Sequence, residues 1–261
     1  MASDSVSGIS DNSLGEAQRE LMRRVYALYA GFAATIPLDA KSGLGGKLFF
    51  GGDVQAARET LFAANIAGAA SLAASSDPAA VRQAMRDGVV DFVVTSLEEA
   101  LRILKNEIRK RLPVSVGIAI SPERLIEQML ERGVLPDLLP PRELPAEAGI
   151  DVDHIGVFIG QGAMALSELK AADDRFVTWS VDREWMRWLP RLDACVKAVV
   201  PETDVVRQRW LQLAPRYLGR AAQRLRGVQL ASGEAERFRA SAAEMMLREG
   251  ADAKLHLQGW D

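Results

Sequence analysis

The chain has 261 residues, 48% of them apolar and 26% charged, and its formal net charge is −3. This composition is typical of a soluble globular protein with room for one large α/β domain, and it lacks the basic excess of a nucleic-acid-binding protein. One cysteine and two histidines exclude an internal disulfide and are too few for an ordinary zinc site. No apolar run is long enough for a membrane span, and the polar first residues do not resemble a signal peptide, so we expect a cytoplasmic protein.

The first half of the chain predicts a regular α/β alternation. Residues 1–12 are rich in Ser, Asp and Gly and predict a disordered N-terminus, after which a capping-box spacing from Ser13 predicts a helix to about Thr35. Five apolar runs then predict strands, and the amphipathic stretches between them predict helices. The strands are expected at 47–50, 69–74, 89–94, 114–119 and 137–139, and the helices at 53–67, 78–86, 97–111 and 122–132. Such an alternation indicates a doubly wound, mainly parallel, Rossmann-like sheet.

The second half predicts a less regular structure. Pro140–Pro145 is a proline-rich excursion, and the runs at 154–160 and 176–181 predict two more strands. Helices are predicted at about 191–199, 204–226 and 233–249, with a short strand at 228–230. We therefore expect a single domain over 13–261, made of a first α/β half (13–139) and a second half (140–261) that carries a helical C-terminal annex.

A colinear set of motifs resembles one known family. The resemblance covers most of residues 20–250 and points to urocanate hydratase (urocanase). It is carried by Gly51-Gly52, Ser96-Leu-Glu-Glu-Ala-Leu101, Pro113-Val-Ser-Val-Gly117, Glu131-Arg-Gly-Val-Leu-Pro-Asp137, Phe176–Asp182 and Leu230–Phe238. The resemblance implies a Rossmann-like domain, a homodimer, and tightly held NAD that acts as an electrophile on urocanate.

The sequence departs from the family where the resemblance places the chemistry. The family's run of glycine pairs keeps only Gly51 and Gly52, and Val54, Gln55, Ala57 and Arg58 stand where glycines are expected. The active-site Cys-Arg-Gly motif is absent from the stretch before Phe176. The resemblance therefore implies the family's fold without its hydratase chemistry.

Three glycine-rich or acidic positions are candidates for cofactor binding. Gly51 and Gly52 could cradle a phosphate at a helix N-terminus, or form a tight strand-to-helix turn. Asp77 follows the second strand, where a Rossmann fold places the acid that binds a ribose; it is also an N-cap before Pro78. Gly160 and Gly162 belong to a G-x-G-x-x-A pattern, which we interpret either as a dinucleotide fingerprint or as a glycine loop at the carboxyl edge of the sheet.

Further side chains have both a functional and a structural interpretation. His154 and Glu168 are the candidates for acid/base catalysis, while Cys195 is expected to be a buried, inert thiol. The tryptophans could stack on a planar ligand, fill an inter-subunit contact or pack in a core; they are Trp179, Trp185, Trp188 and Trp210. Arg216, Arg220 and Arg224 predict a basic stripe on the long helix, either solvated or facing an acidic partner.

These patterns favour a pseudoenzyme related to urocanase, which binds a small molecule or a protein partner and forms a homodimer. One alternative is a divergent NAD-dependent lyase or hydratase that uses His154 or Glu168. A second is a purely structural subunit. We expect no metal and no nucleic-acid or membrane partner, and NAD is the candidate cofactor through the resemblance.

Overall fold

The computed structural model describes residues 5–141, 152–167, 175–181, 183–248 and 255–258. The chain divides into two compact units: Ala27–Leu169, and Met1–Tyr26 together with Lys170–Asp261. Helix α1 (Ser5–Thr35) contributes residues to both, and it begins within the segment that we expected to be disordered. A single domain over 13–261 stays a prediction.

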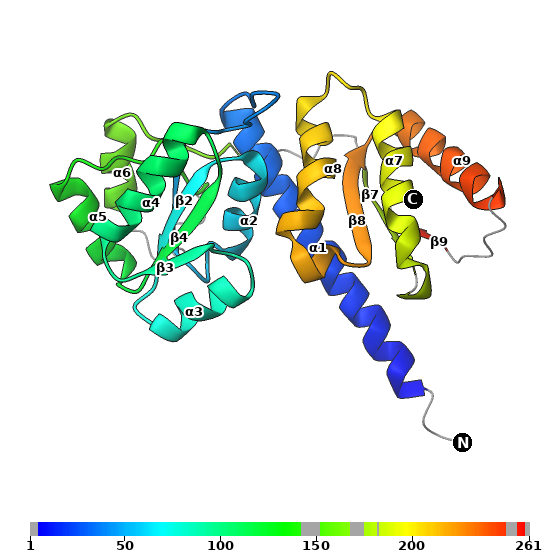
Figure 1. Cartoon of the computed structure of the whole chain (residues 1–261), viewed down its shortest axis with the longest axis horizontal. Helices are drawn as coiled ribbons and strands as arrows, with labels where there is room; N and C mark the ends of the chain where they lie inside the picture. The colour runs from blue at the N-terminus through cyan, green and yellow to red at the C-terminus, as the bar shows by residue number, and fades with distance from the viewer. Residues whose placement is uncertain (1–4, 142–151, 168–174, 182, 249–254, 259–261) are drawn as a thin grey trace. The chain divides into compact units, whose positions relative to one another are not determined.

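The Ala27–Leu169 unit is the predicted Rossmann-like domain (Figure 1). Its six strands form a parallel sheet in the order β3-β4-β2-β1-β5-β6. The strands are β1 (Leu48–Asp53), β2 (Ala70–Ala74), β3 (Phe92–Val94), β4 (Val114–Ile118), β5 (Leu138–Leu139) and β6 (Met164–Ala165). The helices are α2 (Arg58–Ala67), α3 (Pro78–Arg86), α4 (Leu97–Lys110), α5 (Pro122–Glu131) and α6 (Val152–Gly160). The doubly wound parallel fold is confirmed.

Both faces of this sheet are covered, and strands β1, β2, β4 and β5 are buried over nearly their whole length. On one face, β1, β2 and β4 pack against residues of α4, α5 and α6, among them Leu104, Ile126 and Phe158. On the other face, Phe32 of α1 makes an edge-to-face contact with Phe49 of β1, and α2 and α3 cover the rest. Parallel strands in such a sheet are buried on both sides, which is why they read as continuous apolar runs.

The helix starts follow the predicted caps. Side chains of Asp77, Ser96 and Ser121 accept hydrogen bonds from the backbone N–H groups of Ala79, Glu99 and Arg124, and so cap α3, α4 and α5. Each bond satisfies a donor that a helix N-terminus leaves without an intrahelical partner. The predicted positions of these three helices are therefore confirmed.

The predicted strand at 154–160 is wrong, because this run lies in helix α6. A short apolar run without a clear period cannot be assigned to a buried helix or a buried strand from its sequence alone. The parallel strand is instead the shorter β6, which follows the helix and pairs with β5.

The second unit contains a three-stranded antiparallel sheet in the order β8-β7-β9. Its strands are β7 (Arg175–Val181), β8 (Leu225–Leu230) and β9 (Leu255–Gln258); its helices are the 3-10 helix η1 (Arg183–Trp188), α7 (Leu189–Val199), α8 (Val205–Tyr217), the 3-10 helix η2 (Gly219–Ala222) and α9 (Ser232–Arg248). The long helix predicted at 204–226 is wrong beyond Tyr217. It ends there because Gly219 adopts a positive φ of 50°, and β8 begins at Leu225.

Aromatic side chains form the core of the second unit. Trp210 contacts Tyr26 edge-to-face, and Tyr26 also contacts Phe176. Trp179 packs edge-to-face against Phe238 of α9. Both tryptophans are almost fully buried, so their core interpretation is confirmed. No helix among the described residues is long and apolar enough to cross a membrane.

Candidate functional site

The carboxyl edge of the parallel sheet is the candidate site, because open α/β sheets bind ligands outside the carboxyl ends of their strands. The chain leaves β1 at Asp53 and β2 at Ala74, two residues that are register partners. Gly52 and Asp77 therefore lie at this edge, on neighbouring strand ends. The topological switch falls between β1 and β5. Residues 142–151, which follow β5, lie outside the described part of the chain.

The glycine pair lies inside β1 rather than in the turn that follows it. Gly51 interrupts the register with β2 between Phe50 and Gly52. A Cβ atom on Gly51 would lie 3.0 Å from the Cβ of Ala57 and 3.5 Å from a methyl group of Leu61. Gly51 therefore allows α2 to pack closely on β1. Gly52 has a φ of 77°, a backbone conformation that glycine adopts more readily than other residues.

The turn between β1 and α2 uses its own carboxylate as a cap. Oδ1 of Asp53 accepts hydrogen bonds from the backbone N–H groups of Gln55 and Ala56, at 2.9 and 3.1 Å. The N–H of Val54 donates to the carbonyl of Ala74 at 2.8 Å. The next two N–H groups, of Ala57 and Arg58, donate to the carbonyls of Asp53 and Gln55.

All five N–H groups from Val54 to Arg58 are thus engaged within the chain. A dinucleotide site needs glycines whose backbone approaches the pyrophosphate and N–H groups that donate to it. Val54 is 1% exposed, and the carboxylate of Asp53 beside it accepts the hydrogen bonds of two of these N–H groups. The residues of this turn therefore do not fit a pyrophosphate.

Asp77 acts as an N-cap. Its Oδ1 accepts a hydrogen bond from Ala79 N at 2.8 Å, and Asp77 N donates to Oγ of Ser75 at 3.4 Å. The Asp77 side chain is exposed at the carboxyl edge. The structural interpretation of this residue is confirmed, and a contact with a ribose stays a prediction.

Gly160 and Gly162 lie at the opposite edge of the sheet. They precede β6, whose Met164 N donates to the carbonyl of Asp137 at the start of β5. Our interpretation of a glycine loop at the carboxyl edge is therefore wrong, because it assumed that a strand ran into these glycines. A dinucleotide fingerprint lies between a strand and a helix, whereas here the glycines lie between a helix and a strand. They share no site with Gly52 and Asp77.

The two acid/base candidates are not brought together by any described contact. His154 lies in α6, and nothing is described of its side chain; Glu168 lies outside the described residues. Cys195 on α7 is only partly buried, so the expectation of a fully buried thiol is not met. Among the described residues, no cluster of three or more His, Cys, Asp or Glu side chains could hold a metal ion.

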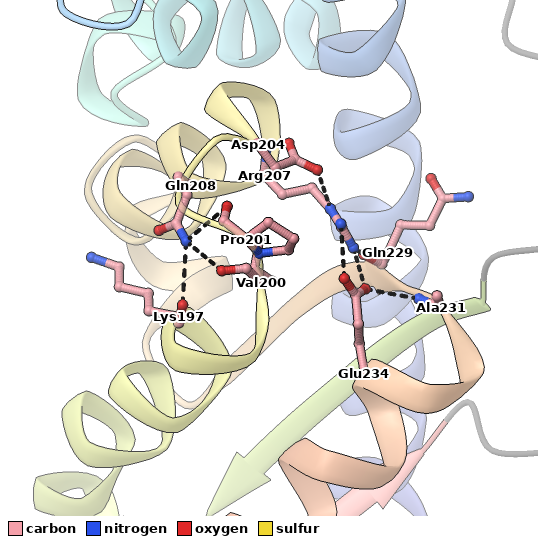
Figure 2. Close-up of polar contacts among 9 residues, drawn as sticks. All are labelled: Lys197, Val200, Pro201, Asp204, Arg207, Gln208, Gln229, Ala231 and Glu234. Atoms are coloured by element: carbon pink, nitrogen blue, oxygen red, sulfur yellow. Dashed lines mark hydrogen bonds and ion pairs between the residues drawn. The ribbon is translucent and has the colours of Figure 1, made fainter.

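The second unit contains a buried charge cluster that the sequence did not predict (Figure 2). Arg207 of α8 makes a bidentate contact with Glu234 of α9 and also binds Oδ2 of Asp204 at 2.6 Å. Glu234 accepts a further bond from Ala231 N at 3.0 Å. The side chains of Arg207 and Glu234 are 16% and 10% exposed.

Mutual contact within this cluster outweighs the cost of burial. Burial acts to raise the pKa of Glu234, but the hydrogen bonds from Arg207 and Ala231 lower it below its ordinary value. Burial likewise acts to lower the pKa of Arg207, and its carboxylate partners raise it instead. The cluster ties the starts of α8 and α9 together, which is a structural role. The partners are 27 residues apart in the chain, so no local sequence signal could reveal the pair.

A second buried carboxylate lies over the antiparallel sheet. Asp193 of α7 accepts hydrogen bonds from Trp179 Nε1 at 3.0 Å and from Arg226 Nε at 3.2 Å. Burial raises the pKa of Asp193 above its ordinary value, and the contacts with Arg226 and Trp179 only partly offset it. Trp179 and Arg226 are register partners on β7 and β8, so the carboxylate of Asp193 accepts hydrogen bonds from side chains of two neighbouring strands.

The predicted basic stripe is not one helix face. Arg216 lies in the last turn of α8, Arg220 lies in η2, and Arg224 precedes β8. The three side chains do not share one helix because α8 ends at Tyr217. The i, i+4 geometry expected for them is therefore wrong.

Comparison with known protein families agrees with this architecture. Residues 32–142 match the family model described as the urocanase Rossmann-like domain. The matched segment runs from the end of α1 to just beyond β5 and includes the β1–α2 turn. It does not reach Phe176–Asp182 or Leu230–Phe238, so the resemblance of the second half stays a prediction. Over residues 32–142, the chain is thus similar to the Rossmann-like domain of urocanase.

Proposed function

We propose that this chain is a urocanase-family protein without urocanate hydratase activity, and that it binds a small molecule or a protein partner. The observation that carries the proposal is the turn between β1 and α2. There Asp53 accepts hydrogen bonds from the N–H groups of Gln55 and Ala56, which in a dinucleotide site would be available to a phosphate. The family's chemistry requires bound NAD. In this chain Val54 is buried in the corresponding turn and Asp53 caps it, so we expect that the chain does not bind NAD.

Electrostatics support the same conclusion. A helix N-terminus attracts anions because its N–H groups are unsatisfied and its dipole is positive there. At α2 the carboxylate of Asp53 already occupies this position, and Glu59 adds a second negative charge in the first helical turn. A dinucleotide phosphate would have to displace the carboxylate of Asp53 and lie close to the negative charge of Glu59, and both effects oppose its binding.

The test is NAD binding by the full chain. We expect native mass spectrometry of freshly purified protein to show no retained dinucleotide, and isothermal titration with NAD to show no saturable heat. Urocanate absorbance should not change with time in the presence of NAD. Stoichiometric NAD or measurable turnover would overturn the proposal and favour the divergent NAD-dependent lyase. The same mass spectrum gives the oligomeric state, for which we expect a homodimer.

A further inference from the structure

The segment from Val205 to Gly233 has an unusual charge composition. It contains six arginines and no lysine, aspartate or glutamate, although the whole chain has a net charge of −3. Two of these arginines, Arg207 and Arg226, point inward and bind the carboxylates of Glu234 and Asp193. The acids that neutralise the segment therefore come from elsewhere in the chain.

Two of the remaining arginines lie close together in the chain, at the end of α8 and in η2. We call Arg216 and Arg220 the arginine corner. Helix η2 contacts α8, so the two elements that carry these residues adjoin one another.

The backbone of the arginine corner is held in place by buried side chains. Leu218 precedes η2 and Ala222 ends it; they are 4% and 1% exposed, whereas Arg220 between them is exposed. Arg216 is also exposed, and its guanidinium lies 5.5 Å from the centroid of the Tyr217 ring. Among the described residues, neither Arg216 nor Arg220 makes an ion pair.

A structural role explains only part of this arrangement. A cation in the last turn of a helix interacts favourably with the helix dipole, which accounts for Arg216 on α8. It does not account for Arg220 in η2, or for the exclusive use of arginine in the segment. Arginine differs from lysine in its planar fork, which binds carboxylates through two parallel hydrogen bonds, and it is enriched at protein interfaces.

We propose that the arginine corner is a docking surface for an acidic segment of a protein partner. The inference rests on the partner-binding half of the proposed function. An acidic protein segment is favoured over a nucleic acid because the chain as a whole is acidic and would repel an extended polyanion beyond the corner. A short run of Glu or Asp side chains can engage the corner alone.

The test is binding of a fluorescein-labelled polyglutamate peptide to the full chain, followed by fluorescence anisotropy at low ionic strength. We expect saturable binding that weakens as salt is added. The variant Arg216→Gln with Arg220→Gln should bind about tenfold more weakly, as expected when two exposed ion pairs are lost. The matched control, Arg82→Gln with Arg124→Gln, removes the same charge from α3 and α5 and should bind within about twofold of the natural chain.

Two further arms separate specific recognition from simple charge attraction. Arg216→Lys with Arg220→Lys keeps the charge but loses the fork, and we expect intermediate affinity. Equal affinity for this variant and the natural chain would overturn the proposal. So would equal loss in the control variant, no binding of the peptide, or tighter binding of single-stranded oligothymidylate than of the peptide. None of these outcomes depends on NAD, so failure here is distinct from failure of the proposed function.

Discussion

Ser71 and Ser115 form a matched pair in which the same substitution should have opposite effects on stability. They are register partners on β2 and β4, and both side chains are 0% exposed. Oγ of Ser115 donates to Oδ1 of Asn65 on α2 at 2.6 Å. Oγ of Ser71 has no hydrogen-bond partner among the described residues. One hydroxyl therefore stabilises the fold, and the other opposes it.

The expected magnitudes follow from the burial of each group. A hydroxyl buried without a hydrogen bond costs about 1–3 kcal/mol in protein mutational data, so Ser71→Ala should stabilise the Rossmann-like unit by about 1 kcal/mol after the loss of van der Waals contacts. Ser115→Ala removes a hydrogen bond and leaves the buried carbonyl of Asn65 without this donor, which should destabilise the unit by about 1–3 kcal/mol. The two variants should thus differ by about 2–4 kcal/mol, the sum of these two effects.

The assay must report on the Rossmann-like unit. All five tryptophans of the chain lie beyond residue 170, so tryptophan fluorescence reports on the other unit and serves as an internal control. Amide hydrogen exchange of β2 and β4 gives the local free energy of opening, which should rise in Ser71→Ala and fall in Ser115→Ala. Faster exchange in Ser71→Ala would refute the reasoning, because it would mean that the hydroxyl has a partner such as a buried water.

Two further predictions concern the predicted glycines and the buried charge cluster. Gly51→Ala should lower the free energy of unfolding by about 1–3 kcal/mol, because the new Cβ would lie 3.0 Å from the Cβ of Ala57. In Gly160→Ala the new Cβ meets no atom within 4 Å, so this variant should be neutral or slightly stabilising at the end of α6. Equal urea midpoints for the two variants would contradict the packing role of Gly51. Glu234→Gln weakens the contact with buried Arg207 and should cost about 2–4 kcal/mol at neutral pH. Because the folded-state pKa of Glu234 is lowered, its contribution is complete above its ordinary pKa and is lost as the pH falls through the folded value, so the urea midpoints of the two proteins should converge on acidification. A constant difference at every pH would exclude the ion pair as its cause.

The parts of the fold that could be predicted from the sequence depend on local signals. The helix caps at Asp77, Ser96 and Ser121 each combine a capping side chain with a helix that starts at the next residue, and all three were located correctly. The buried strands β1, β2 and β4 were predicted because a strand that is buried on both faces appears in the sequence as a nearly continuous apolar run. These signals act within a few residues of one another.

Some of the parts that were not predicted depend on residues far apart in the chain, whereas others had local signals that were not used. The apolar run that became α6 has no clear period. The end of α8 was predicted too late, although Pro215 and Gly219 are local signals for the end of a helix. The pair formed by Arg207 and Glu234 exists only because β8 brings α8 and α9 together. Gly162 was placed at the wrong edge of the sheet because the preceding element was taken for a strand.

The two glycines of β1 have structural roles that need no bound cofactor. In a dinucleotide-binding loop, glycines serve both the approach of the phosphate and the packing of the helix on the strand. Here Gly51 still meets the second need, since Ala57 and Leu61 occupy the space beside it. The residues of the turn do not meet the first need, because Asp53 accepts hydrogen bonds from the N–H groups of Gln55 and Ala56 and Val54 is 1% exposed beside them. Gly51 and Gly52 therefore explain how the strand and the helix pack, and the proposed lack of NAD binding rests on the residues that follow them.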